Sequence, residues 1–153
     1  MDAEVYPEER VEEFVNDHFL PARVNVREQP EDFQRLGARF GAEWTPTILL
    51  LDGDGEERHR IEGFLPADDF IAQLALGQAR IEFSSGDFAA AEHRYREIVE
   101  RHPDSETAPE ALYWAGVARY KASGDAAALH ETGKAFQERY RDSVWAKKAS
   151  VWT

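Results

Sequence analysis

Residues 44–52 have the sequence Trp-Thr-Pro-Thr-Ile-Leu-Leu-Leu-Asp and give the clearest indication of the fold of this chain. Four consecutive aliphatic residues, Ile48 to Leu51, are too few for a helix. They also do not alternate with polar residues, which is typical of a strand buried on both faces between helical layers. Proline cannot donate to a strand ladder, so we expect Pro46 at the mouth of the strand. The stretch therefore predicts the central strand of an α/β sheet.

Two amphipathic helices are expected before this strand. Apolar residues keep helical spacing from Val11 to Phe19, and the pattern ends before Pro21. A second apolar stripe, from Phe33 to Phe40, is closed by Gly41. Between the two helices, residues 23–26 (Arg-Val-Asn-Val) alternate in the manner of a short strand.

A hairpin and a third helix are expected after the strand. Residues 52–55, Asp-Gly-Asp-Gly, form a turn signal, and the polar segment 58–62 beyond it suits an antiparallel edge strand. Pro66 breaks that strand, and the acidic pair Asp68 and Asp69 opens a helix. The first half of the chain thus reads helix, strand, helix, strand, strand, helix.

This order, together with Trp44-Thr45-Pro46-Thr47, resembles the second part of a thioredoxin-like domain over residues 1–75. The resemblance implies an incomplete α/β unit with a mixed sheet and a cis Thr45–Pro46 peptide bond. It also implies a peptide-binding ledge, formed by the backbone of Thr45 and the flat side chain of Trp44. The Cys-x-x-Cys of such domains would lie upstream of Met1. Either the start of the chain is missing, or the protein naturally lacks the redox half.

The second half of the chain, residues 76–153, predicts an all-helical unit. Gly86, Tyr95 and Pro103 are spaced as in the second helix of a tetratricopeptide repeat. Residues 101–114 recur at 139–152 with a shift of 38, because Arg-x-x-Asp-Ser and the following Ala, Ala and Trp reappear in register. The segment therefore resembles a pair of tetratricopeptide-like repeats, whose first helices line a concave binding surface.

Candidate binding residues follow from these resemblances. For polypeptide binding they are Trp44, Thr45 and Pro46 on the ledge, and Tyr113, Arg119 and Tyr120 on a first helix. Trp145 and Trp152 lie on a last helix with no following repeat to cover it. Solenoid ends and open sheet edges recruit partners, so we also expect a homo-oligomer.

Charge narrows the choice of partner. Residues 1–76 contain seven Arg and no Lys against 18 Asp and Glu, a net charge of −11, whereas residues 77–153 are nearly neutral. Such a surface repels phosphate backbones and anionic lipid, so neither nucleic acid nor membrane is an expected partner. A basic partner would be attracted. No apolar run suggests a span or a leader, so we expect a cytoplasmic protein, or a periplasmic one if an upstream signal segment is missing.

The residue inventory limits the chemistry. The chain has no cysteine, which rules out thiol catalysis and thiolate metal sites by its own residues. Its five histidines show no metal-ligand spacing, and no phosphate loop is present, so we expect neither metal nor cofactor. The leading hypothesis is a non-catalytic, polypeptide-binding adaptor. The alternatives are a thiol–disulfide oxidoreductase whose Cys-x-x-Cys lies upstream of Met1, and a self-associating assembly module.

Overall fold

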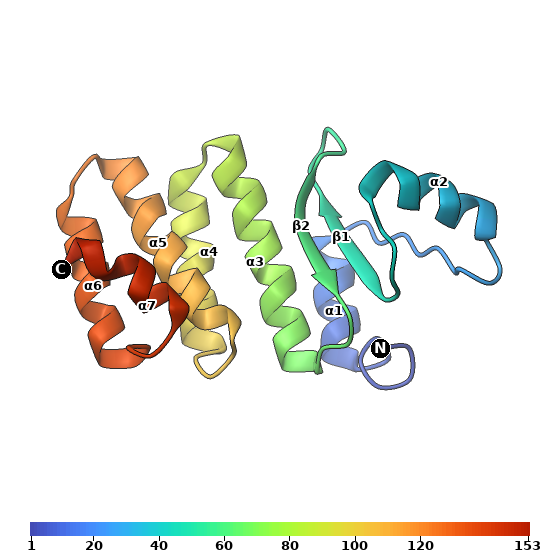
Figure 1. Ribbon diagram of the computed structural model, residues 1–153, viewed down its shortest axis with the longest axis horizontal. Helices are drawn as coiled ribbons and strands as arrows, with labels where there is room; N and C mark the ends of the chain where they lie inside the picture. Colours follow the sequence, from blue (N-terminus) through green and yellow to red (C-terminus); the bar gives the residue numbers. More distant parts are fainter.

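The computed structural model describes residues 1–153 as an elongated molecule, with an α/β unit at one end and a helical unit at the other (Figure 1). The long helix α3 lies between the two units (Figure 1). No helix is both long and apolar enough to span a membrane. The elements are α1 (Glu9–His18), α2 (Pro30–Phe40), β1 (Thr47–Leu51), β2 (Glu57–Glu62), α3 (Ala67–Ser85), α4 (Phe88–Arg101), α5 (Thr107–Ser123), α6 (Ala127–Arg139), α7 (Val144–Ala149) and the 3₁₀ turn η1 (Ser150–Trp152).

The sheet is a single antiparallel hairpin of β1 and β2. Asp52 closes its turn, because its Oδ1 accepts from the backbone N–H groups of Asp54 and Glu56, each at 3.0 Å. Its other carboxylate oxygen accepts from Arg58 Nε at 2.7 Å. The predicted hairpin, its antiparallel pairing and its polar second strand are all present.

Two predictions about the sheet are wrong. Residues 23–26 form no strand; the chain there is irregular and ends in a turn. The stretch around Ile48–Leu51 is not a central strand, because β1 pairs with β2 alone and leaves its other edge open. A strand needs a partner for its backbone groups, and no third strand exists to pair with either segment.

The α/β unit packs the hairpin onto α3. Leu50 and Ile61 point from the sheet into a core that includes Phe70 and Leu74 of α3. Gly77 permits the close approach, since a Cβ there would lie 2.2 Å from Leu50 Cδ2. Val5, which is 1% exposed, completes this core from the N-terminal turns.

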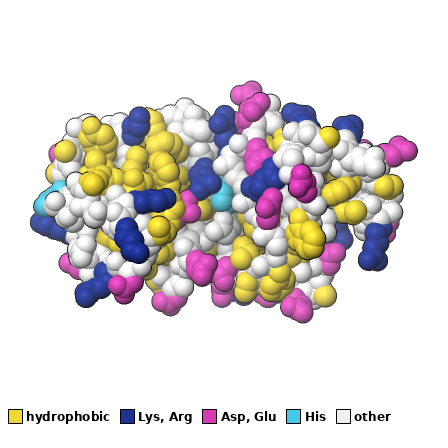
Figure 2. Space-filling view, in the orientation of Figure 1, with side chains coloured by type: hydrophobic (Ala, Val, Ile, Leu, Met, Phe, Trp, Pro, Cys, Tyr) yellow, Lys and Arg dark blue, Asp and Glu magenta, His cyan; other side chains and the backbone are white.

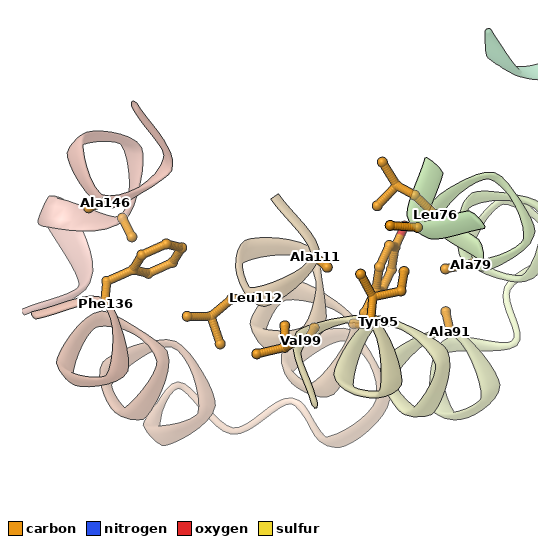
Figure 3. Close-up of a cluster of buried hydrophobic side chains, with 14 residues drawn as sticks. Leu76, Ala79, Ala91, Tyr95, Val99, Ala111, Leu112, Phe136 and Ala146 are labelled. Carbon is orange, nitrogen blue, oxygen red and sulfur yellow. The ribbon is translucent and has the colours of Figure 1, made fainter. Parts of the chain in front are cut away.

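The helical unit is built from the helix pairs α3–α4 and α5–α6, followed by α7 (Figure 1). Its core combines alanines with larger side chains such as Leu76, Tyr95 and Phe136 (Figure 3). Gly116 on α5 lies against α6, where a Cβ would come within 2.4 Å of Thr132 Oγ1. In Figure 3, Phe136 reaches toward Ala146 and ties α6 to α7.

The repeat seen in the sequence corresponds to equivalent positions in the structure. Ser105, one residue before the N-cap Glu106 of α5, accepts from Ala108 N at 3.2 Å, and Ser143, the N-cap of α7, accepts from Ala146 N at 3.0 Å. Ala108 and Ala146 are both buried. The 38-residue shift therefore relates two helix starts at which a serine accepts from the backbone N–H three residues later.

Candidate functional site

The predicted ledge lies at the end of the hairpin, before β1. The Thr45–Pro46 peptide bond is cis, the isomer that the resemblance implied. The loop is held by Thr47 Oγ1, which donates to the carbonyl of Trp44 at 2.6 Å, and by Gly63 N, which donates to the carbonyl of Pro46 at 2.9 Å. Trp44 is 70% exposed, which is unusual for so large an apolar side chain.

The open edge of β1 continues this ledge. Pro46 and Asp52, which bracket the strand, both make backbone hydrogen bonds toward β2. Antiparallel pairing alternates along a strand, so the backbone groups of Thr47, Leu49 and Leu51 point to the opposite side. No hydrogen bond outside the helices and the ladder uses a backbone group of these three residues. We call these outward-pointing groups the β1 edge.

The two edges of the sheet differ in composition. On β2, the residues paired with Thr47, Leu49 and Leu51 are Glu62, Arg60 and Glu57, so their backbone groups lie along the other edge of the sheet, and Arg58 adds a fourth charge. Charged side chains on an edge strand hinder the addition of another strand. β1 has the sequence Thr-Ile-Leu-Leu-Leu and carries no charge. The β1 edge is therefore unprotected, whereas the edge of β2 is guarded.

The outer face of the sheet carries α2 on a narrow attachment. Arg60 donates to the carbonyl of Gly41 at 3.3 Å and also to the carbonyl of Phe40, at the C-terminal end of that helix. The same guanidinium forms ion pairs with Glu57 at 2.7 Å and Glu62 at 3.2 Å. No residue of α2 is fully buried, so its predicted apolar stripe is only partly covered.

The predicted binding residues of the helical unit do not join the ledge. The ledge belongs to the α/β end of the molecule, and α5 to the other (Figure 1). Tyr113 is stacked on Trp152 at 4.5 Å between ring centroids, and so offers little free surface. Arg119 is paired with Glu131 at 2.5 Å, while Tyr120 is 39% exposed.

The sequence predicted that nothing would cover Trp145 and Trp152. In the structure, both rings are partly covered. The chain turns after α6, and both rings pack on Tyr113, at 5.2 Å and 4.5 Å between centroids. Lys148 lies 3.8 Å above the ring of Trp145. Hydrophobic side chains gather over α5 and α7 on this face of the molecule (Figure 2). The two tryptophans therefore close the helical unit and are only partly buried.

A partly buried polar network, which no spacing in the sequence indicates, joins the sheet to the helical unit. Arg80 donates to His59 Nδ1 at 3.0 Å and also bonds Glu110 of α5. Because Arg80 can only donate, the ring proton is on Nε2, which faces Gln73 Oε1 at 2.7 Å. Gln73 in turn donates to Thr107 Oγ1 at 3.0 Å. Burial and the neighbouring Arg80 lower the pKa of His59 to about 4.

The geometry is that of an α/β unit in which a cis-proline turn leads into a hairpin packed on a helix. The chain belongs to the thioredoxin-like domain family, which matches residues 1–78, just over half of its 153 residues. No curated protein and no solved structure matches the chain. The family match ends within α3, the helix shared by the two units.

Proposed function

We propose that this protein is a non-catalytic adaptor that binds an extended polypeptide at the ledge and the β1 edge. The observation that most directly supports this proposal is the row of unpaired backbone groups on Thr47, Leu49 and Leu51, which follows the exposed Trp44 in the chain. A row of this kind is satisfied best by the backbone of another extended chain.

Trp44 supplies the side-chain contact in this proposal. Strand addition gives affinity through main-chain hydrogen bonds, whereas specificity comes from side-chain contacts beside the edge. A large exposed aromatic ring at the mouth of the strand is a suitable anchor, because tryptophan is enriched among residues that dominate binding energy. The half-buried Pro46 fixes the backbone between this anchor and the edge.

The helical unit is proposed to consist of tetratricopeptide-like repeats that hold the α/β unit on a rigid frame. Support comes from the 38-residue internal shift, the matched caps at Ser105 and Ser143, and the small residue at the α5–α6 crossing. Tyr120, together with Arg119 beside it, offers a secondary contact for a partner. The network from His59 to Glu110 keeps the two units in register.

An oxidoreductase is the second candidate, and the family match is compatible with it. This chain has no thiol, so that activity requires a cysteine pair on a segment outside the 153 residues. The ledge would then position a substrate peptide beside that pair. Self-association is a third candidate. The unprotected β1 edge is a better contact surface for it than the tryptophans of α7 and η1.

Binding of an unfolded polypeptide tests the proposal. The probe is fluorescein-labelled lysozyme, reduced and blocked with iodoacetamide; native lysozyme serves as the control for charge. We expect the unfolded form to bind more tightly, and Trp44→Ala to weaken binding about tenfold. Val144→Ala is the control, because Val144 is also apolar and exposed, at 58%, but lies on α7 in the helical unit, away from the ledge. Equal binding of native and unfolded lysozyme, or equal losses in the two variants, would contradict the proposal.

A further inference from the structure

We infer that the segment bound at the β1 edge is basic, with apolar residues in its middle and Lys or Arg at its ends. This inference rests on the proposed function and names the chemistry of the partner. The middle of the segment would lie beside Ile48 and Leu50, whose side chains face the core. It would also lie beside Leu49 and Leu51, on the other face of the strand. Apolar residues at alternate positions match both faces.

The charge requirement follows from the ion pairs of residues 1–76. Five of the seven arginines are engaged: Arg10, Arg23, Arg35, Arg58 and Arg60. These pairs use seven of the 18 acidic residues, which leaves eleven carboxylates without a partner against two arginines. The charge on this unit is therefore a surplus of solvent-exposed acid, and it attracts cations.

Unpaired acids also bracket the β1 edge along the chain. Glu43 immediately precedes the ledge, and Asp54 and Glu56 lie in the turn after β1. All three are exposed and take part in no ion pair. A strand laid along the edge would meet a carboxylate near each of its ends. One basic residue at each end is the simplest complement.

A second copy of the chain fits this surface less well. Two β1 strands paired about a twofold axis would be antiparallel. The Glu43 end of one copy would then approach the Asp54 end of the other, so that acid would meet acid at both ends. The two units would also bring net charges of −11 together. A basic polypeptide avoids both penalties and satisfies the same backbone groups.

Three capped peptides test the inference: Lys-Thr-Val-Ile-Val-Thr-Lys, and the same peptide with Gln or with Glu at both ends. Affinity is measured by fluorescence anisotropy in 50 mM and 500 mM NaCl. Hydrogen exchange of the full chain reads the amides of Thr47, Leu49 and Leu51. We expect the Lys peptide to bind at least tenfold more tightly than the Gln peptide in 50 mM salt. That advantage should shrink in 500 mM salt, because salt screens exposed charges.

The variant Leu49→Pro removes one outward N–H that the ladder does not use, so the hairpin should still form. Leu49→Ala keeps that N–H and is the matched control. We expect only Leu49→Pro to abolish protection of the edge amides. If Leu49→Pro does not fold, protection of the three amides in the unaltered chain still decides the matter.

The outcomes separate the preference for a basic segment from the proposed function. Equal binding of all three peptides with edge protection would overturn the basic preference and leave the proposed function intact. No protection by any peptide would overturn both. Protection that rises with protein concentration in the absence of peptide would show that a second copy occupies the edge, and would overturn this inference.

Discussion

Acid should destabilise this protein through His59. His59 is 6% exposed and its pKa is lowered to about 4, from an ordinary value of 6.5. The folded state therefore favours the neutral ring, whereas the unfolded chain takes up a proton at higher pH. Stability from this residue is fully present above about pH 6.5 and is lost as the pH falls toward 4.

The size of the effect follows from the shift. The fall in the pKa of His59 from 6.5 to about 4 corresponds to roughly 3 kcal/mol of unfolding free energy. This is the difference between high pH, where the ring is neutral in both states, and low pH, where it is protonated in both. Between pH 7 and pH 5, linkage gives a loss of about 2 kcal/mol. The first cause is burial, which disfavours the charged ring; the second is Arg80, because a protonated ring would lose its bond from Arg80 and place a second positive charge beside that guanidinium. The hydrogen bond with Gln73 and the charge of Glu57 offset only part of these two effects.

Urea denaturation at pH 7 and pH 5 measures the loss, with His59→Gln as the variant that cannot titrate. We expect the unaltered chain to lose about 2 kcal/mol more than the variant over this interval. His93→Gln is the matched control, since His93 is exposed, and it should behave as the unaltered chain. An NMR titration of the His59 ring provides a second readout. The same pH dependence in His59→Gln and the unaltered chain, or a ring that titrates near 6.5, would refute the reasoning.

Three further outcomes are expected. Gly77→Ala should lower the free energy of unfolding by about 1–3 kcal/mol in urea denaturation, because its Cβ would lie 2.2 Å from Leu50 Cδ2; Gly53→Ala, which meets nothing within 4 Å, should change it little. Ser105→Ala and Ser143→Ala should each cost about 1 kcal/mol in the same assay, and an unchanged stability would deny that the two caps are equivalent. The chain should not reduce insulin above a dithiothreitol blank, because it has no thiol with which to form a mixed disulfide.

Local patterns predicted most of the elements. Helical spacing with a proline or glycine at its end located α1 and α2, and the Asp-Gly-Asp-Gly turn located the hairpin. The 38-residue shift found two helix starts that share a serine cap. These features depend on residues within one or two turns of one another, so a single sequence carries enough information to find them.

The polar network from His59 to Glu110 could not be predicted from such local patterns. Its members come from β2, α3 and α5, and no spacing links His59 to Glu110 before the sheet packs on α3. The positions of Trp145 and Trp152 were missed for a related reason. Their burial depends on the turn after α6, which brings both rings back onto Tyr113.

The failed prediction for β1 has a different origin. Four aliphatic residues in a row correctly indicated a strand whose two faces both suit apolar surroundings. The number of neighbouring strands, however, is a property of the whole sheet, and residues 23–26 provide none. A strand with the composition of a central one thus stands at an edge, while its partner β2 has the charges of a true edge strand. That mismatch between composition and position is the physical reason to expect a further strand beside Leu49.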